Sequence, residues 1–155
     1  MLSVAQDVAF VLETDKLKNI VRKTRNISND RYENDAEHSW HICLMAMALR
    51  KYSNEPVEIS RVVQMLIVHD LGEISSGDVI VYKKTQEESR EELQAAKSLL
   101  SMIGAPQSEE LVRLLEEFDA RKTSEAKFAN AMDRMEPVLQ NINRQGETWK
   151  RNGIT

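Results

Sequence analysis

A histidine and an aspartate stand next to each other at the end of an apolar segment. His69 and Asp70 directly follow residues 65–68 in MLIVHDLG, and burying two such polar groups is costly unless each has a partner. Near the end of a helix both side chains can turn toward one cation held between helices. The pair therefore indicates a metal site, although two ligands alone do not make one.

Two more residues of ligand type lie in apolar surroundings. His38 precedes a mostly apolar helix face, and Asp133 lies within FANAMDRMEPVL, whose apolar residues indicate a buried segment. Together with His69 and Asp70 they supply two imidazoles and two carboxylates, a set that suits Mn, Fe, Co, Ni or Zn better than Ca. Such a site would keep positions open for water and a substrate oxygen.

A simpler interpretation accounts for each of these residues singly. His69 can cap the end of its helix, Asp70 can cap a turn, and Asp133 can pair with Arg134 on a solvated face. The spacing of any one residue, taken alone, favours this interpretation. Spacing therefore leaves both interpretations open.

Other chemically distinctive residues have ordinary roles. His41 lies one turn after His38 and is expected to pack or to orient a ligand rather than to bind the metal. Trp40 and Trp149 are expected to be core or interface anchors rather than substrate platforms. Cys43, the only cysteine, is expected to be a small buried side chain on a helix.

Helices are the elements that position these residues. Apolar residues recur at helical spacing almost throughout, and no sustained alternation indicates a sheet, so the predicted fold class is all-α. One helix over residues 3–13 carries Val4, Val8, Val11 and Leu12 on one face, and a second, capped by Asp15, carries Leu17, Ile20 and Val21. The other predicted helices cover residues 35–52, 59–71, 86–103, 108–120 and 124–143.

Caps and breaks define the ends of these helices. Asp35 is the predicted N-cap of the helix over residues 35–52, and Gly72 is the predicted stopping point of the next one. Residues 26–34 read as a loop. Residues 75–85 are predicted to be a loop that covers something, with a short β-branched run at residues 79–81 that could be extended.

Length and charge exclude several function classes. The chain has 155 residues, which is enough for a single apolar core, and we expect one domain over residues 1–155. The formal net charge of −4 argues against duplex DNA or RNA as a partner. No segment approaches the roughly 20 apolar residues that span a bilayer, and the N-terminus does not resemble a leader, so we expect a cytoplasmic protein without a membrane partner.

Three stretches of the sequence carry a family resemblance. They are ENDAEHSWH (residues 33–41), MLIVHDLGEISSGD (residues 65–78) and EAKFANAMDRMEPVLQN (residues 125–141). In this order they resemble the three motif blocks of the HD-domain phosphohydrolases, and within them of small proteins similar to the bacterial 5′-deoxynucleotidases. A bare His-Asp pair is a weak signal, whereas four ligand positions spread over three blocks are specific.

The resemblance implies a single-domain HD-type bundle of about six or seven helices with one bound cation, and it places the metal ligands at His38, His69, Asp70 and Asp133. It also implies catalytic roles for Glu73, which would orient or deprotonate the attacking water, and for Asp78, which would position water or a sugar hydroxyl or protonate the leaving oxygen. The three histidines of the chain are too few for a two-metal phosphodiesterase site. We therefore expect one divalent cation: Mn, Co, Fe, Ni or Zn, with Mg as an alternative.

The substrate that the resemblance implies is a nucleoside 5′-monophosphate, hydrolysed to nucleoside and phosphate by a homodimer. Arg22 corresponds to a phosphate-contacting arginine of the family's early helix. The deoxynucleotidases carry next to it a tryptophan that is implicated in rejecting the ribose 2′-hydroxyl, and this chain has Lys23 there. Lys23 is thus a second expected substrate contact, and ribonucleotides should be hydrolysed unless Tyr82 or Tyr32 restores the barrier.

Two alternative functions use the same residues. One is a phosphodiesterase or nucleoside-triphosphate hydrolase built on the same metal site, since ligands alone do not fix the substrate. The other is a regulatory HD protein that only binds a nucleotide. The presence of both Glu73 and Asp78 argues against a binder, which has less need of two further carboxylates.

Overall fold

The computed structural model describes residues 4–79 and 84–154. Helices dominate it, so the prediction of an all-α fold is confirmed. In chain order the elements are α1 (Val4–Thr14), a 3₁₀ turn (Asp15–Asn19), β1 (Val21–Arg25), β2 (Tyr32–Asn34), α2 (Asp35–Leu49), a 3₁₀ turn (Arg50–Tyr52), α3 (Ile59–Val68), α4 (Glu73–Ser76), α5 (Gln86–Leu100), α6 (Gln107–Ala120), α7 (Ser124–Asn143) and α8 (Glu147–Arg151). Among the described residues, no helix is both long enough and apolar enough to cross a membrane.

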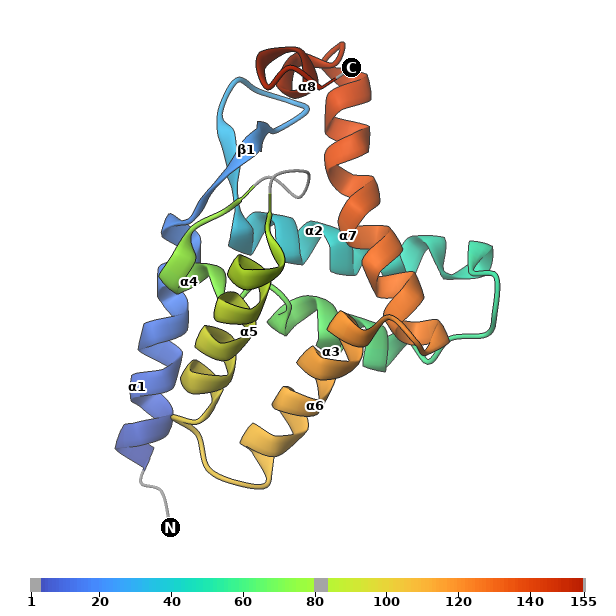
Figure 1. Ribbon diagram of the computed structural model, residues 1–155. Coiled ribbons are helices and arrows are strands. Elements are labelled where there is room, and N and C mark those ends of the chain that lie inside the picture. Colours follow the sequence, from blue (N-terminus) through green and yellow to red (C-terminus); the bar gives the residue numbers. More distant parts are fainter. Residues whose placement is uncertain (1–3, 80–83, 155) are drawn as a thin grey trace.

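The core lies where α2, α3 and α7 pack together at the centre of the molecule (Figure 1). α6 packs on α3 and α7, and α5 packs on α4 and α6. Ala126 and Ala129 on α7 are fully buried, and their small size lets this helix approach its neighbours closely. Cys43 on α2 is buried, as expected. The fully buried apolar side chains are Ile42, Ala46, Val62, Met65, Leu66, Leu100, Ala126 and Ala129.

α1 exposes the apolar face predicted for it. Val4, Val8, Val11 and Leu12 keep between 51% and 78% of their surface exposed, and no residue of α1 is buried. Phe10 alone from this helix packs against the core. The pattern correctly predicted a helix with one apolar face, but within the described part of the chain most of that face does not pack against other elements.

The prediction of a helix after Asp15 is wrong beyond the 3₁₀ turn over Asp15–Asn19. The chain continues instead as β1, which pairs antiparallel with β2 inside the stretch predicted as a loop. The carbonyl oxygen of Ile20 accepts a hydrogen bond from the backbone N–H of Asp35 at 3.1 Å, and the Arg25 guanidinium lies over the Tyr32 ring at 4.8 Å. These pairings between distant residues override the local helical pattern.

The start of α2 differs from the prediction by one residue. Asn34, not Asp35, is the N-cap: its side-chain oxygen accepts from the backbone N–H of Glu37 at 3.0 Å, and Glu37 in turn accepts from the backbone N–H of Asn34 at 3.2 Å. This reciprocal capping box satisfies two free N–H groups of the first turn. Asp35 is thereby moved into that turn, where its side chain has no exposed surface.

Gly72 does not stop the preceding helix, because α3 already ends at Val68. The backbone of Gly72 is helical and leads directly into α4. A Cβ atom at this position would overlap the backbone carbonyl oxygen of Glu92 on α5. Gly72 is therefore required by the close packing of α5 on this turn, which holds His69 and Asp70 against the rest of the bundle.

The loop predicted over residues 75–85 begins with the last residues of α4. Part of the β-branched run at residues 79–81, and all of Tyr82, lie outside the described residues.

Candidate metal centre

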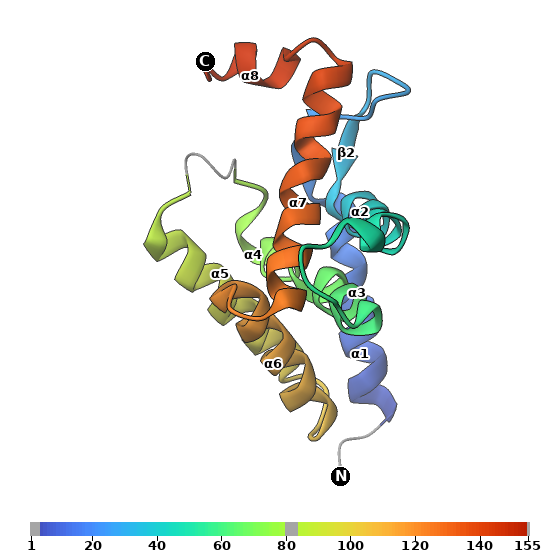
Figure 2. The ribbon, with the colours of Figure 1, turned by 90° about the vertical axis from the view of Figure 1, so that its right-hand side faces the viewer.

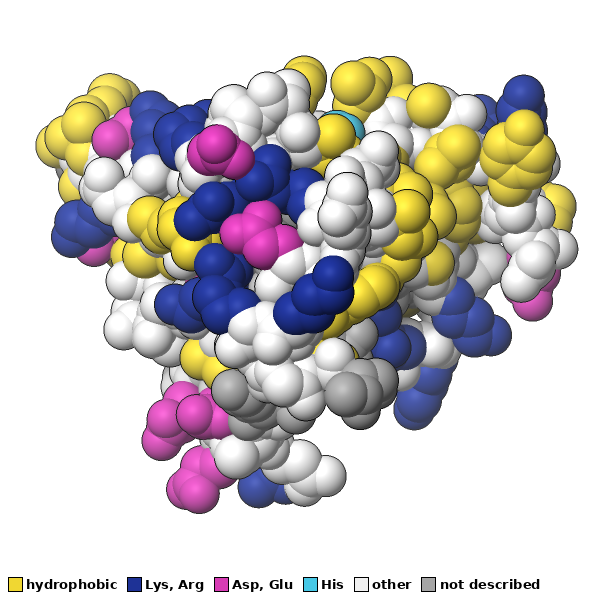
Figure 3. Space-filling view, turned by 90° about the horizontal axis from the view of Figure 1, so that it is seen from above, with side chains coloured by type: hydrophobic (Ala, Val, Ile, Leu, Met, Phe, Trp, Pro, Cys, Tyr) yellow, Lys and Arg dark blue, Asp and Glu magenta, His cyan; other side chains and the backbone are white. Residues whose placement is uncertain are grey.

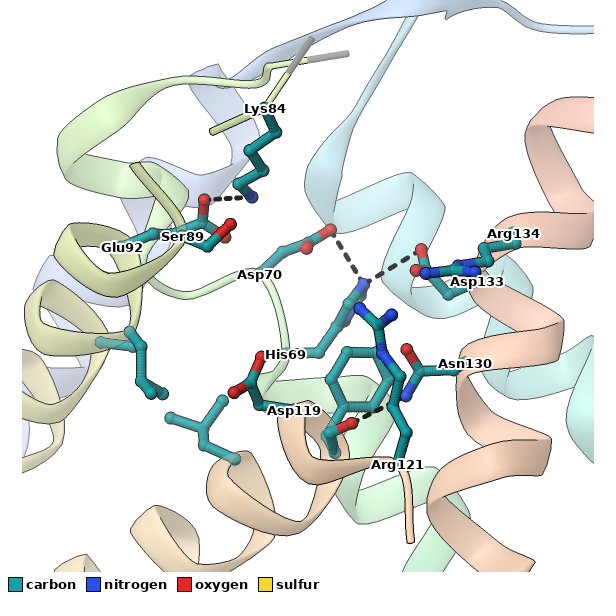
Figure 4. Close-up of a pocket in the computed structure, with 14 residues that line it drawn as sticks. His69, Asp70, Lys84, Ser89, Glu92, Asp119, Arg121, Asn130, Asp133 and Arg134 are labelled. Carbon is teal, nitrogen blue, oxygen red and sulfur yellow. Dashed lines mark hydrogen bonds and ion pairs between the residues drawn. The ribbon is translucent and has the colours of Figure 1, made fainter. Parts of the chain in front are cut away.

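His69 points one ring nitrogen toward Asp70 and Asp133 in Figure 4. We call His38, His69, Asp70 and Asp133 the His/Asp cluster. Its Nδ1 donates to the backbone carbonyl oxygen of Leu66 at 2.9 Å, which leaves Nε2 free to bind a cation. Nε2 lies 3.1 Å from Asp70 Oδ2 and 3.5 Å from Asp133 Oδ1. This nitrogen is buried, and no well-aligned hydrogen bond reaches it from the described residues.

His38 reaches the same point from α2. Its Nε2 lies 3.1 Å from Asp133 Oδ1 and 3.9 Å from Asp70 Oδ2. Its Nδ1 lies 3.3 Å from Glu136 Oε2, so that Glu136 holds the ring with Nε2 inward, as carboxylates do behind metal-binding histidines. The imidazole has no exposed surface.

These contacts fit a single cation. Two ligand atoms, each about 2.1 Å from one ion and separated by octahedral or tetrahedral angles, lie about 3.0–3.4 Å apart. The nitrogen–oxygen distances in the cluster run from 3.1 to 3.9 Å. One ligand atom each of His38, His69 and Asp70 lies within 4.8 Å of the other two, and Asp133 contacts both imidazoles. The His/Asp cluster could therefore bind a metal ion.

Charge balance in the cluster involves protons on the imidazoles. Burial favours the neutral form of His69, but Asp70 and Asp133 outweigh it and raise its pKa to about 10. Burial likewise opposes ionisation of Asp70, yet His69 and Arg22 lower its pKa to about 2. A cation entering the cluster would have to replace the imidazole protons.

Arg22 lies on β1, not on a helix as the resemblance implied. Its Nη1 donates to Asp35 Oδ1 at 3.0 Å and to Asp70 Oδ2 at 3.3 Å, and its Nε lies 3.5 Å from Glu33 Oε2. Burial disfavours its charge, but Asp70, Asp78 and other acidic neighbours raise the pKa of the guanidinium. The hairpin that the sequence did not reveal therefore carries a fixed positive charge to the edge of the cluster.

Glu73, the first residue of α4, is buried beside Asp35. Burial and then the charges of Asp70 and Asp35 raise the pKa of Glu73 to about 11. One carboxyl oxygen each of Glu73, Asp35 and Asp78 lies within 4.8 Å of the other two, so negative charges on these groups oppose one another. Glu73 therefore holds a proton when no cation is near, and a cation's charge would oppose this.

The Asp78 side chain contacts the backbone of Lys23. Asp78 Oδ2 accepts a hydrogen bond from the backbone N–H of Lys23 at 3.0 Å. Both residues line a cavity of about 500 Å³, together with Arg22, Glu73 and the two aspartates of the cluster. The structure thus places six of the eight predicted site residues at this cavity, and the other two, His38 and His69, in contact with the cluster aspartates.

A smaller cavity of about 150 Å³ lies against His69 (Figure 4). It shares Asp70, Asp133, Lys84 and Arg134 with the larger cavity. Lys84 pairs with Glu92. Figure 3 shows basic side chains gathered on the face of the molecule near α8, although the chain as a whole is acidic.

Several residues of the site were not found from the sequence. Glu136 follows Asp133 by almost one helical turn and could have been identified as its neighbour on the same face. Glu33 and Asp35 are buried, but their roles depend on the hairpin. Trp149 was expected in the core or an interface and instead lines the larger cavity.

The remaining expectations concern side chains near the site. His41 Nδ1 lies 3.3 Å from Glu136 Oε1, so it contacts the residue that holds His38. Trp40 is 64% exposed and is therefore not a core residue. Tyr32 is bound by Arg25 and Arg151 and does not belong to the described lining of the larger cavity.

Comparison with known proteins identifies the family. The model of the HD domain family matches residues 14–155. The chain belongs to the HD domain family. The crystal structure of a predicted metal-dependent phosphohydrolase from Magnetospirillum magnetotacticum MS-1 is 41% identical, with a TM-score of 0.91, and the match covers 100% of this chain and 81% of that one.

Curated relatives include proteins named 5′-deoxynucleotidases. HDDC2 of Homo sapiens is 29% identical over 118 residues, which cover 75% of this chain and 55% of the relative. HDDC2 of Bos taurus is 29% identical over 110 residues, which cover 70% of this chain and 52% of the relative. This HD domain thus spans about half the length of these curated relatives.

Proposed function

We propose that this HD domain is a metal-dependent phosphohydrolase that converts nucleoside 5′-monophosphates to nucleoside and phosphate. The observation that carries the proposal is that the buried His/Asp cluster opens into a cavity that also presents Arg22, Glu73 and Asp78. The named activities of the relatives support it.

The cation would be held by His38, His69, Asp70 and Asp133. When bound, it supplies a Lewis acid that polarises the phosphoryl group and neutralises its charge. We propose Mn, Co, Fe, Ni or Zn, with Mg as an alternative, because imidazole and carboxylate ligands suit these ions. Two histidines in the cluster favour one ion rather than two.

The cavity residues divide the remaining tasks. Arg22 binds a phosphoryl oxygen, with its guanidinium fixed by Asp35 and Asp70. Glu73, which would give up its own proton when the cation binds, accepts a proton from the water that attacks phosphorus. Asp78 passes a proton from solvent to the leaving 5′-oxygen as the P–O bond breaks. The water contributes its oxygen to phosphate, and the nucleoside leaves with a hydroxyl group. The acid and base tasks of the two carboxyls can be exchanged.

A second candidate substrate is a nucleoside triphosphate. The smaller cavity is lined by Lys84, Arg121 and Arg134, and neither arginine has an ion-pair partner among the described residues. These cations would suit further phosphate groups. Analysis of the products separates the candidates, since a monophosphatase releases only inorganic phosphate and nucleoside.

The proposed function is tested by a screen of phosphate release. Metal-stripped protein is supplied with Mn, Co, Mg, Zn or Ni and then with each ribo- and deoxyribonucleoside monophosphate, triphosphates and a phosphodiester. We expect metal-dependent release from monophosphates. Cleavage of the diester or triphosphate alone would reject the monophosphatase, and release from no substrate with any metal would reject the enzyme.

We propose that the protein acts as a homodimer in the cytoplasm. Two exposed apolar faces support the dimer: that of α1 and that of α2, where Trp40, Leu44 and Met47 are at least 49% exposed. A second copy of the chain would cover them. Light scattering should give twice the mass of the chain, and Trp40→Glu should give the monomer. Cell fractionation tests the location.

A further inference from the structure

The larger cavity has a wall that leads away from the metal cluster. Along α7 its lining residues are Asp133, Arg134, Pro137, Val138 and Asn141, which recur on one face of the helix. An α-helix rises about 1.5 Å per residue, so this wall is about 12 Å long. A phosphate group bound at the His/Asp cluster, beside Asp133, therefore leaves the other end of the wall to the rest of the substrate.

The far part of the lining is apolar and includes an aromatic ring. Val79, Pro137, Val138, Trp149 and Ile154 all contribute to it. Trp149 comes from α8, which packs on the end of α7 and on β1 (Figure 1). Figure 2 shows α8 leading away from the end of α7. Its side chain is half-buried, so part of it is available to a ligand.

Hydrogen bonds hold α8 in place beside the cavity. Asn141 Oδ1 accepts from the backbone N–H groups of Thr148 at 3.1 Å and Trp149 at 3.3 Å. Arg151 Nη2 donates to the carbonyl oxygen of Lys23 at 3.0 Å, and its Nη1 donates to the hydroxyl of Tyr32 at 2.6 Å. The ring is thus presented from a fixed backbone, which reduces the entropy cost of binding a ligand against it.

Most of the neutral polar side chains at this end already have hydrogen-bond partners. Asn141 uses its side-chain oxygen on α8, and its Nδ2 donates to the carbonyl oxygen of Pro137 at 2.9 Å. Thr148 Oγ1 is directed to the carbonyl oxygen of Lys23 at 3.5 Å. Thr24 Oγ1 has no hydrogen-bond partner among the described residues, but it is buried. A hydroxyl can donate as well as accept, so this group does not select one base edge.

We propose that Trp149 is the stacking surface for the nucleobase, and that it accepts purines and pyrimidines alike. The substrate class rests on the proposed function, and the inference adds the residue that binds the base and the reason for low base selectivity. A planar base stacks on an aromatic side chain through its face, which every base possesses.

Kinetics with and without a base test this inference. Trp149→Ala should raise KM for adenosine and cytidine 5′-monophosphates by about tenfold or more, with little change in kcat. Ribose 5-phosphate, which has no base, should be hydrolysed equally by both forms, and Trp149→Phe should restore most of the nucleotide KM. Tyr52→Ala, at an exposed aromatic residue outside the lining of the cavity, is the matched control. An equal effect on nucleotide and sugar phosphate, or no effect, would overturn the inference.

Binding can be followed independently of hydrolysis. The chain has two tryptophans, so Trp40→Phe leaves Trp149 as the sole indole. Adenosine 5′-monophosphate should quench its fluorescence, and ribose 5-phosphate should not. Quenching without hydrolysis would reject the proposed function and keep the base surface. Hydrolysis without quenching would keep the proposed function and reject Trp149 as the base surface.

Discussion

Replacing Glu136 by glutamine should weaken metal binding although Glu136 is not a proposed ligand. Its carboxylate lies 3.3 Å from His38 Nδ1 and 3.3 Å from His41 Nδ1, and it also accepts from Gln140. It has 1% exposed surface, so no solvent replaces its charge. Glutamine preserves the shape and one acceptor oxygen but removes the negative charge that makes the His38 ring a stronger ligand.

The size of the effect follows from this arrangement. Loss of a carboxylate behind a metal-binding histidine costs about 10- to 100-fold in metal affinity, or about 1.4–2.8 kcal/mol. Because glutamine can still accept from Nδ1, we expect the lower end, about tenfold.

Competition with a fluorescent chelator gives the Mn²⁺ or Zn²⁺ affinity of the two forms. Glu117→Gln, which removes a carboxylate that pairs with Arg61 away from the cluster, is the control and should leave the affinity unchanged. An unchanged Kd for Glu136→Gln in a folded protein, or an equal loss in the control, would refute the reasoning.

Three further predictions concern catalysis, sugar selectivity and pH. Glu73→Gln should keep the metal content and lower turnover by about a hundredfold or more, whereas Asp70→Asn should lose metal; full metal and activity in both variants would contradict the roles. With Lys23 at the cavity, matched kcat/KM values should show ribonucleotides hydrolysed appreciably and Lys23→Trp should favour deoxyribose, while a deoxyribose preference above about a hundredfold in the wild type would contradict this. Because the folded-state pKa of His69 is raised from 6.5 to about 10, its contribution to stability is complete below pH 6.5 and is lost as the pH rises toward 10. Denaturant unfolding in chelator should show this decline, and a flat profile over that range would speak against it.

The helices could be predicted from the sequence because their apolar residues repeat at the right period. The predicted helix ends were less accurate where a contact with a residue far away in the sequence determines where the helix begins or ends. Gly72 was interpreted as a helix stop. Glycine is needed there because the backbone of Glu92 on α5, 20 residues later in the sequence, leaves no room for a side chain. The β hairpin was missed because β1 is stabilised by pairing with β2 and by Arg25 over Tyr32, neither of which leaves a periodic pattern.

The candidate site was predictable to the extent that motifs carry it. The spacing of His69, Asp70 and Asp133 left a bland interpretation open, and only the three motif blocks together favoured a metal site. The sequence could not show that Glu136 supports His38, because a buried glutamate on a helix looks like a solvated one. It also gave no sign that Trp149 lines the cavity, since that depends on how α8 is fastened to β1.

The central claim is that one cation binds between α2, the end of α3 and α7. Anomalous diffraction from crystals soaked in Mn²⁺ or Co²⁺, recorded at the absorption edge of the metal, tests it most directly. We predict one strong peak about 2.0–2.2 Å from ligand atoms of His38, His69, Asp70 and Asp133. A peak elsewhere with this cluster empty, or two peaks within it, would contradict the claim.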